Sequence, residues 1–341
     1  MKKFDYEAVI GHELICAKLK QAVCRHQFVN AYLFSGAEGI GKKTVAYPFI
    51  AALLCHAPVD GKPCLHCPSC MLMTAGNHPD FITLQTPEDN KTFGVDVVRE
   101  QLIQEAYVRP FSSERKVFLI EKGELLTTAA QNALLKVLEE PPEYVVFIIL
   151  TTAQNLLLDT VLSRCLKLQF LPLNQALCHR YFEQLTTGDA PRRELAASFA
   201  QGNIGRGKQM LTDEEFYNLY ENTVTNMQYL LNSLSAFADF NQFLTDNREK
   251  IENIIDFMLV FLRDALRLNL TGKAKLICTD QQAAVKAFSQ KLAPGNLVRL
   301  MEAVIHYRER LQKNASFAGA GLELLTKMQE ETHDQSNRNP I

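Results

Sequence analysis

One stretch near the start of the chain has the residue types and spacing of a loop that holds phosphate. Residues 36–42 read GAEGIGK, directly after an apolar run and at the start of a helical pattern. Glycines allow backbone N–H groups to curl around phosphate oxygens, and a helix N-terminus adds positive partial charge. The lysine of such a loop reaches the terminal phosphates. The candidate phosphate-binding residues are therefore Gly36, Gly39, Gly41, Lys42 and Thr44.

The residue after the loop lysine departs from the pattern of an active nucleotide hydrolase. That position is normally Ser or Thr, whose hydroxyl holds magnesium, but here it is Lys43. Thr44 comes one residue later, which is about 100° further round a helix, so it cannot simply take over that role. Residues 36–44 therefore predict the P-loop fold with a magnesium site that lacks its usual hydroxyl ligand.

A second departure lies at the end of an apolar run that predicts a buried strand. Glu121 ends that run, where a P-loop enzyme places the carboxylate that holds its metal. The next residue is typically a Glu that activates water in ATPases of this arrangement, but here it is Lys122, which cannot act as an anionic base. Two independent losses predict that the chain does not hydrolyse ATP, while the retained Lys42 leaves ATP or ADP binding open.

Four cysteines have the spacing of a metal site. Cys55 precedes the run CLHCPSC, in which Cys64, Cys67 and Cys70 form two overlapping CxxC units. Tetrahedral zinc favours four such thiolates, so the pattern predicts a structural Zn²⁺. An iron–sulfur cluster, free thiols, a redox pair and competition from His66 are the alternatives.

The remaining cysteines and several histidines show no ligand spacing. A place among apolar residues predicts small buried side chains for Cys16, Cys24, Cys178 and Cys278. The histidines without ligand spacing are His12, His26 and His179.

Composition limits the classes of protein to consider. The chain has 341 residues, enough for two or three domains, and is 47% apolar and 22% charged. Its net charge of −2 lacks the basic excess of a protein that grips DNA alone. The sequence contains no uncharged apolar stretch of about 20 residues, so we expect no membrane span. The start of the chain does not resemble a secretory signal, and with the cysteine usage this favours a cytoplasmic protein.

Alternating strand and helix patterns must position these residues. Strands are expected at 31–35, 80–84, 117–121, 145–151 and 166–170, and helices at 13–26, 43–55, 95–107 and 128–140. This order predicts a parallel sheet covered by helices. Thr128 and Gln131 suggest a capping box for the last helix, which ends at Pro141.

From residue 171 onward the pattern is helical. The expected organisation is an α/β nucleotide-type domain with the cysteine insertion at 1–170, a small helical lid at 171–212 and an all-α collar at 213–335. An apolar stripe at 251–266 indicates either the core of a helical bundle or a subunit contact.

Two further runs carry a resemblance to a known family. They are SRC at 163–165, just before the last strand, and NALLKVLEEPP at 132–142. Together with the phosphate loop and the cysteine insertion, they resemble the clamp-loader branch of the AAA+ proteins. Within that branch the chain is similar to the bacterial DNA polymerase III delta prime subunits over nearly its whole length.

The resemblance implies a function within a hetero-oligomer. Clamp loaders are five-subunit arcs that open a sliding clamp and close it around primed DNA, using ATP bound at subunit boundaries. A delta prime subunit does not hydrolyse ATP and supplies an arginine to the ATP of the neighbouring motor subunit, and by its place in SRC that residue is Arg164. The implied partners are the motor and delta subunits and, through the complex, the clamp and DNA.

Other positions follow from the resemblance in the same way. Residues 9–12 resemble the stretch that flanks adenine, and Thr152 lies near the sensor-one position. The sensor-two arginine of motor subunits falls at Gly205, beside Arg206. Two other functions stay open: an active ATPase motor of the same complex, and an unrelated zinc-stabilised interaction protein with an NTPase fold.

Overall fold

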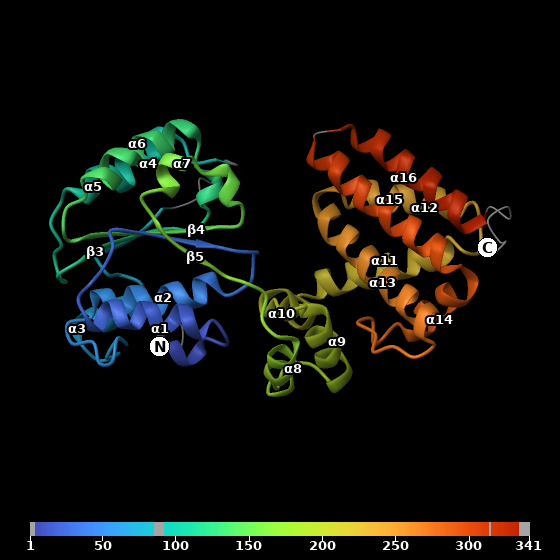
Figure 1. Cartoon of the computed structure of the whole chain (residues 1–341), viewed down its shortest axis with the longest axis horizontal. Coiled ribbons are helices and arrows are strands. Elements are labelled where there is room, and N and C mark those ends of the chain that lie inside the picture. The colour runs from blue at the N-terminus through green and yellow to red at the C-terminus, as the bar shows by residue number, and fades with distance from the viewer. Residues whose placement is uncertain (1–3, 85–91, 314, 334–341) are drawn as a thin grey trace. The chain divides into compact units, whose positions relative to one another are not determined.

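The computed structural model describes residues 4–84, 92–313 and 315–333. The chain divides into two compact units (Figure 1). The first comprises Met1–Leu177 with Gly202–Gly205, and the second comprises Cys178–Gln201 with Arg206–Ile341. The division into three domains at 1–170, 171–212 and 213–335 stays a prediction. Positions 1–3, 85–91, 314 and 334–335 of those domains lie outside the described residues.

A five-stranded sheet forms the centre of the first unit. Its strand order is β2-β3-β4-β1-β5, and all neighbours are parallel. The strands are β1 Ala31–Ser35, β2 Phe81–Thr83, β3 Lys116–Ile120, β4 Val145–Thr151 and β5 Leu166–Gln169. All five predicted strands are confirmed, with ends that differ by at most one residue, and the predicted α/β class is confirmed with them.

Alternation along the strands builds a core on each face of the sheet. Tyr32 and Phe34 of β1 join one core, and Leu33 of the same strand joins the other. Such alternation follows from the two-residue period of a strand, and burial of both faces explains the continuous apolar runs. Helices α1–α3 lie on one side of the sheet and α4–α7 on the other (Figure 1). Their bounds are α1 Glu13–Cys24, α2 Lys42–Leu54, α3 Pro68–Ala75, α4 Val95–Val98, α5 Gln104–Ala106, α6 Thr128–Glu139 and α7 Asp159–Leu162.

The predicted helices exist, but two details differ. A π-helical segment, Arg99–Ile103, joins α4 to α5 where one regular helix was expected. The N-cap of α6 is Thr127, whose side chain accepts from the Ala130 N–H at 3.2 Å. The predicted capping box of Thr128 and Gln131 is therefore wrong. Gln131 is buried, and its amide instead joins the loop at Leu156 and Leu158 to the start of α6.

The rest of the chain is helical, as expected. These helices are α8 Gln175–Glu183, α9 Ala190–Ala200, α10 Ile204–Thr212, α11 Glu214–Tyr229, α12 Ala236–Asp246, α13 Ile251–Thr271, α14 Gln282–Lys291, α15 Pro294–Gln312 and α16 Phe317–His333. Helix α13 packs against α11, α14 and α15, and Ile254, Met258 and Leu262 of its stripe are fully buried. The stripe is therefore the core of the bundle. Among the described helices, none is long and apolar enough to cross a membrane.

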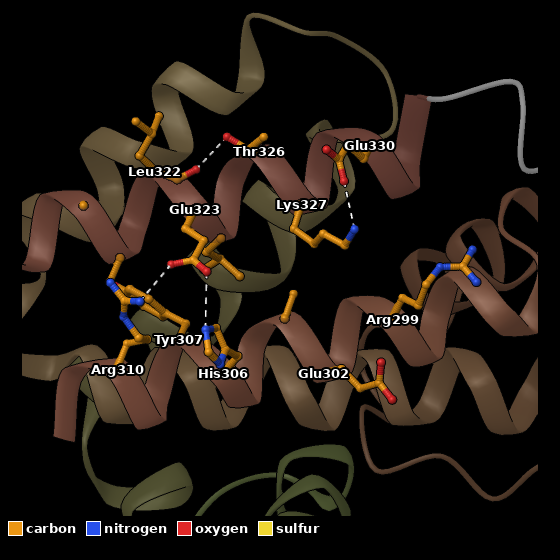
Figure 2. A pocket seen from close by; sticks show the side chains of 14 residues that line it. Arg299, Glu302, His306, Tyr307, Arg310, Leu322, Glu323, Thr326, Lys327 and Glu330 are labelled. Atoms are coloured by element: carbon orange, nitrogen blue, oxygen red, sulfur yellow. Dashed lines mark hydrogen bonds and ion pairs between the residues drawn. The ribbon is translucent and has the colours of Figure 1, made fainter. Parts of the chain in front are cut away.

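Helices α15 and α16 border a pocket of about 690 Å³ in the second unit (Figure 2). Its charged side chains pair across and along the two helices. Glu323 lies 3.3 Å from His306 and 3.7 Å from Arg310, and Lys327 lies 2.9 Å from Glu330. These pairs balance charge within the pocket, so they do not give it the character of an anion or cation site.

Candidate phosphate loop, cysteine cluster and Arg164

The phosphate loop follows the inner strand β1 at the carboxyl edge of the sheet, where open α/β sheets bind their ligands. It runs from Ser35, the last residue of β1, to Lys42, the first residue of α2. Gly36, Gly39 and Gly41 have φ of +154°, +76° and +110°. These backbone conformations favour glycine and explain why the loop contains three of them.

Lys42 is held inside this loop. Its side chain is buried, and its Nζ donates to the carbonyl oxygens of Gly36 and, at 2.8 Å, of Ala37. Burial lowers the pKa of Lys42, and the nearby carboxylates of Glu124 and Glu38 act in the opposite direction. The loop therefore contains the lysine that the sequence pattern predicts.

The first of the two departures, Lys43, contacts the candidate metal carboxylate. Lys43 Nζ lies 2.6 Å from a carboxylate oxygen of Glu121, and the hydroxyl of Tyr47 donates to the other oxygen at 3.1 Å. Burial and the Glu121 charge raise the pKa of Tyr47 to about 12, so its hydroxyl stays protonated. Thr44 and Lys122 are exposed. The candidate metal carboxylate is thus occupied by groups from α2, and the residues present do not fit a P-loop magnesium site.

Glu124 was not identified from the sequence, although it lies at the same edge. One carboxylate oxygen accepts from the Thr152 hydroxyl at 2.8 Å and the other from the Thr152 backbone N–H at 3.2 Å. Burial opposes ionisation of Glu124, but hydrogen bonds from backbone N–H groups and from Thr151 and Thr152 outweigh it and lower the pKa of the carboxyl. Glu124 therefore fixes Thr152, the residue expected near the sensor-one position.

Residues 203–205 also contact the phosphate loop. The Gly205 N–H donates to the Gly39 carbonyl at 3.1 Å, and the Asn203 side chain donates to the Glu38 carbonyl at 2.6 Å. A Cβ at Gly205 would lie 2.5 Å from Gly39 Cα. The position at which the sensor-two arginine was expected is therefore a backbone contact that only glycine permits.

His12 also contacts the loop, a role that its spacing did not reveal. Its backbone is left-handed, with φ of +58°, and its Nε2 donates to the Ile40 carbonyl at 2.9 Å. The ring packs edge-on against Phe170 at a centroid distance of 4.8 Å. The predicted 9–12 stretch thus adjoins the phosphate loop.

The four predicted cysteine ligands come together in the first unit. All their Sγ atoms lie within 4.8 Å of one another. Cys55 Sγ is 3.5 Å from Cys64 Sγ and 3.9 Å from Cys67 Sγ, and Cys64 Sγ is 4.0 Å from Cys70 Sγ. Four sulfurs about 2.3 Å from a tetrahedral zinc would be about 3.8 Å apart, so the cluster fits such a metal. His66 turns its Nδ1 to the Cys64 carbonyl and is not part of the cluster.

Local sequence explains the shape of this cysteine cluster. Cys67 is the N-cap of α3 and Pro68 its first residue, while Gly76 ends it with φ of +77°. Asp60 and Gly61 both have positive φ in a turn closed between Val59 and Lys62. This Asp-Gly pair is a tight-turn signal in the sequence, and the turn returns the chain from Cys55 to the CLHCPSC run.

The thiols of the cysteine cluster differ in pKa. Burial opposes ionisation of Cys64, but backbone N–H groups, including that of Cys67, lower its pKa to about 7. Burial raises the pKa of Cys55 and of Cys70. A bound cation would favour the thiolate form of all four.

A buried hydrogen-bond network supports the cluster from behind. The hydroxyls of Ser69 and Ser113 donate to the Leu54 carbonyl at 2.6 and 2.8 Å. His78 accepts from a backbone N–H through Nδ1, so its Nε2 donates to Ser69 at 2.9 Å. The carboxylate of Asp80 accepts the backbone N–H groups of residues 111–113. The cluster is therefore joined to both α2 and the loop before β3.

The other cysteines fit the expectation with one exception. Cys16, Cys178 and Cys278 are buried, as predicted, but Cys24 is exposed. It lies in the last turn of α1, one residue beyond Val23, which faces the core. The prediction of a buried Cys24 is therefore wrong.

Arg164 lies in the same unit, between α7 and β5. Its Nη2 is 2.7 Å from Glu139 near the end of α6, and its Nη1 donates to the Thr160 carbonyl at 2.8 Å. One third of its side chain is exposed. These two contacts fix the direction of the guanidinium while leaving part of it accessible.

The strand order, the glycine loop after the inner strand β1 and the carboxylate after β3 define the class of protein, which has the P-loop fold of the AAA+ type. The family model "DNA polymerase III, delta subunit" matches residues 11–174, and the model of its C-terminal part matches residues 214–327. The chain therefore belongs to the DNA polymerase III delta subunit family.

Individual relatives agree with this family. The chain is 29% identical to DNA polymerase III subunit delta prime of Escherichia coli, over 87% of this chain and 86% of that protein. It is 31% identical to subunit tau of Bacillus subtilis over 76% of this chain, but the match spans only 50% of tau. A solved gamma subunit-related protein from Thermotoga maritima covers 93% of this chain and 99% of its own, with 14% identity and a TM-score of 0.45.

Proposed function

We propose that this chain is a non-hydrolysing subunit of a clamp loader, and that it supplies Arg164 to the ATP site of a neighbouring motor subunit. The names of its relatives support a place in that assembly. The observation that carries the non-hydrolysing part of the proposal is the ion pair between Lys43 and Glu121, the residues that correspond to the two magnesium ligands of an active P-loop enzyme. The exposed Lys122 leaves no anionic base there.

The contacts of Arg164 support its role in trans. A guanidinium held by Glu139 and by a backbone carbonyl is preorganised, so little conformational entropy is lost when it meets a partner's phosphate. A fixed cation beside the γ-phosphate stabilises the charge that develops during transfer. In this function the motor and delta subunits are direct partners, and the sliding clamp and primed DNA are reached through the complex.

The experiment is the clamp- and DNA-stimulated ATPase of the reconstituted complex. We expect Arg164→Ala to lower turnover by at least about 100-fold, because the arginine contributes mainly in the transition state. Arg164→Lys should restore little, since lysine lacks the planar fork. The control is Arg25→Ala, which removes an exposed arginine at the end of α1.

Complex formation must be verified by size-exclusion chromatography for each variant. Unchanged turnover with Arg164→Ala in an intact complex would leave the chain a scaffold only. ATP hydrolysis by the isolated chain would instead favour the alternative of an active motor subunit.

We further propose that the cysteine cluster holds a structural Zn²⁺. Four cysteine ligands would fill the tetrahedral coordination of zinc and leave no position for a substrate. The hydrogen bonds of Ser69 and His78 behind the cluster are also typical of a structural site. Metal analysis of the purified chain should give one zinc per molecule. Iron with a visible sulfide-to-iron absorption would establish an iron–sulfur cluster instead.

A further inference from the structure

The first turn of α2 places a fixed positive charge where P-loop proteins bind magnesium. In those proteins the hydroxyl after the loop lysine and a carboxylate at the end of another strand of the sheet hold the ion together. Here the corresponding pair is Lys43 and Glu121, and they bind each other at 2.6 Å. The ammonium group thus reaches the carboxylate that would otherwise hold the metal.

This arrangement opposes a divalent ion in two ways. An ammonium group has three donors and no acceptor, so it cannot ligate a cation. Both oxygens of Glu121 are also engaged, one by Lys43 and the other by the protonated hydroxyl of Tyr47. A magnesium ion would have to displace Lys43 and then remain near a like charge.

The part of the site that holds phosphate is nevertheless intact. Gly39 and Gly41 keep the positive φ values that direct backbone N–H groups into the loop, and helix α2 begins at Lys42. The Lys42 ammonium is buried within the loop. The side chain of Lys43 is 55% exposed and has room to turn from Glu121 towards a bound anion.

We propose that Lys43 replaces the divalent cation, so that this loop binds a polyphosphate chain in its metal-free form. The ligand class is a nucleoside di- or triphosphate or an inorganic polyphosphate, because both present the same phosphate oxygens to the loop. Lys42 and Lys43 together supply the positive charge that Lys42 and magnesium supply in other P-loop proteins. This binding is separate from the proposed action of Arg164 on a neighbour's ATP and does not depend on it.

The test is calorimetric titration of the full chain with ATP, ADP and inorganic tripolyphosphate. Buffers are freed of divalent ions by a resin and used with and without added MgCl₂, because a soluble chelator would also attack the cysteine cluster. For the wild type we expect a Kd that changes less than about threefold on adding magnesium. Tighter binding of ATP and ADP than of tripolyphosphate would identify a nucleotide as the ligand, and equal binding would identify the polyphosphate chain.

Variants make the role of Lys43 measurable. Lys43→Thr restores a hydroxyl and frees Glu121, so magnesium should now tighten binding by about tenfold or more. Without magnesium the same variant should bind more weakly than the wild type. Lys18→Thr removes an exposed lysine from α1 and should change neither value.

Three results would overturn the proposal. They are binding by the wild type only when magnesium is present, no binding of any of the three ligands in either buffer, and equal behaviour of Lys43→Thr and wild type. Circular dichroism of each variant establishes that it is folded, which the exposure of Lys43 favours. None of these results depends on turnover by the clamp loader, so the arginine proposal is tested independently.

Discussion

Because Gly205 has no side chain, its backbone can contact the phosphate loop directly. Its N–H donates to Gly39, and the absence of a Cβ allows the two backbones to meet. The resemblance drawn from the sequence places the sensor-two arginine of motor subunits at this position, and any side chain here would need the space that the backbone of Gly39 fills. The contact itself therefore requires glycine.

We predict that Gly205→Ala destabilises the contact between Gly205 and the phosphate loop by about 1–3 kcal/mol, since the added methyl would lie 2.5 Å from backbone atoms that cannot yield easily. Amide exchange at Gly205, whose N–H bonds Gly39, should become faster. Gly319→Ala is the matched control, because there a Cβ meets nothing closer than 3.7 Å. Equal exchange in both variants would show that the segment tolerates a side chain.

Ionisation of the Glu124 carboxyl makes the stability of the first unit depend on pH. Its pKa is lower in the folded chain than its ordinary value of 4.5, so the folded state binds its proton less readily than the unfolded state. The resulting stabilisation is present in full above that ordinary value and is lost as the pH falls from there through the lower pKa of the folded chain.

We expect Glu124→Gln to destabilise the first unit by about 1 kcal/mol or less at neutral pH, because the group is partly exposed. The difference from wild type should shrink as the pH is lowered below the ordinary pKa. Urea unfolding between pH 3 and 7, followed by amide exchange in β4, measures both effects. A difference that is constant with pH would show that ionisation of Glu124 contributes nothing.

At the scale of elements, α2 joins the phosphate loop to the cysteine cluster. It begins at Lys42 and ends at Leu54, directly before Cys55. Its 13 residues correspond to a length of about 20 Å, and the intervening apolar side chains are almost all buried. Because α2 is a buried, continuous helix, an ordered phosphate loop at its start and an ordered cysteine cluster at its end support each other.

Loss of the metal should first affect the segment between α2 and α3. We predict that Cys70→Ser lowers the zinc content to a small fraction of one per chain and destabilises this segment by several kcal/mol, since metal binding contributes directly to its folding. Zinc release measured with a chromogenic chelator, and exchange of the amides of α3, report the two effects. Cys24→Ser, which changes the exposed cysteine, should retain the metal. Full zinc content in Cys70→Ser would remove Cys70 from the ligand set.

The strands and most helices could be predicted because burial on both faces of a parallel sheet leaves uninterrupted apolar runs, and helices between them keep a 3.6-residue period. The clustering of the four cysteines was predictable from their spacing alone. Helix α3 was not predicted, although Pro68 at its first position and Gly76 at its end are typical of helix termini, because the segment is only eight residues long. The capping error at Thr127 arose because two adjacent threonines offer the same cap.

Contacts between distant residues could not be predicted in the same way. Nothing in the local pattern relates Lys43 to Glu121, Asn203 to Glu38 or Glu124 to Thr152, since each pair meets only after the strands have paired. The identity of Lys43 did predict a damaged magnesium site, with Glu121 as the candidate metal carboxylate. That the two residues bind each other is a result of the three-dimensional structure.

At the scale of the whole molecule, two separately packed units carry different parts of the proposed function. The first holds the phosphate loop, the cysteine cluster and Arg164, and the second holds the helical bundle built around α13. The bundle contains most of the region matched by the C-terminal family model. Residues that act on phosphate and residues that build the bundle are thus largely separated along the chain.

The segment Gly202–Gly205 is an exception to that separation, because the chain leaves the first unit at Leu177 and returns to it for only four residues. A truncation after Leu177 would discard the hydrogen bonds that Asn203 and Gly205 make to the loop carbonyls. A truncation after Gly205 would keep them but would also retain α8 and α9 without the rest of their own core. No single cut therefore yields the phosphate-loop unit both complete and alone, and dissecting this protein requires an internal deletion that rejoins Leu177 to Gly202.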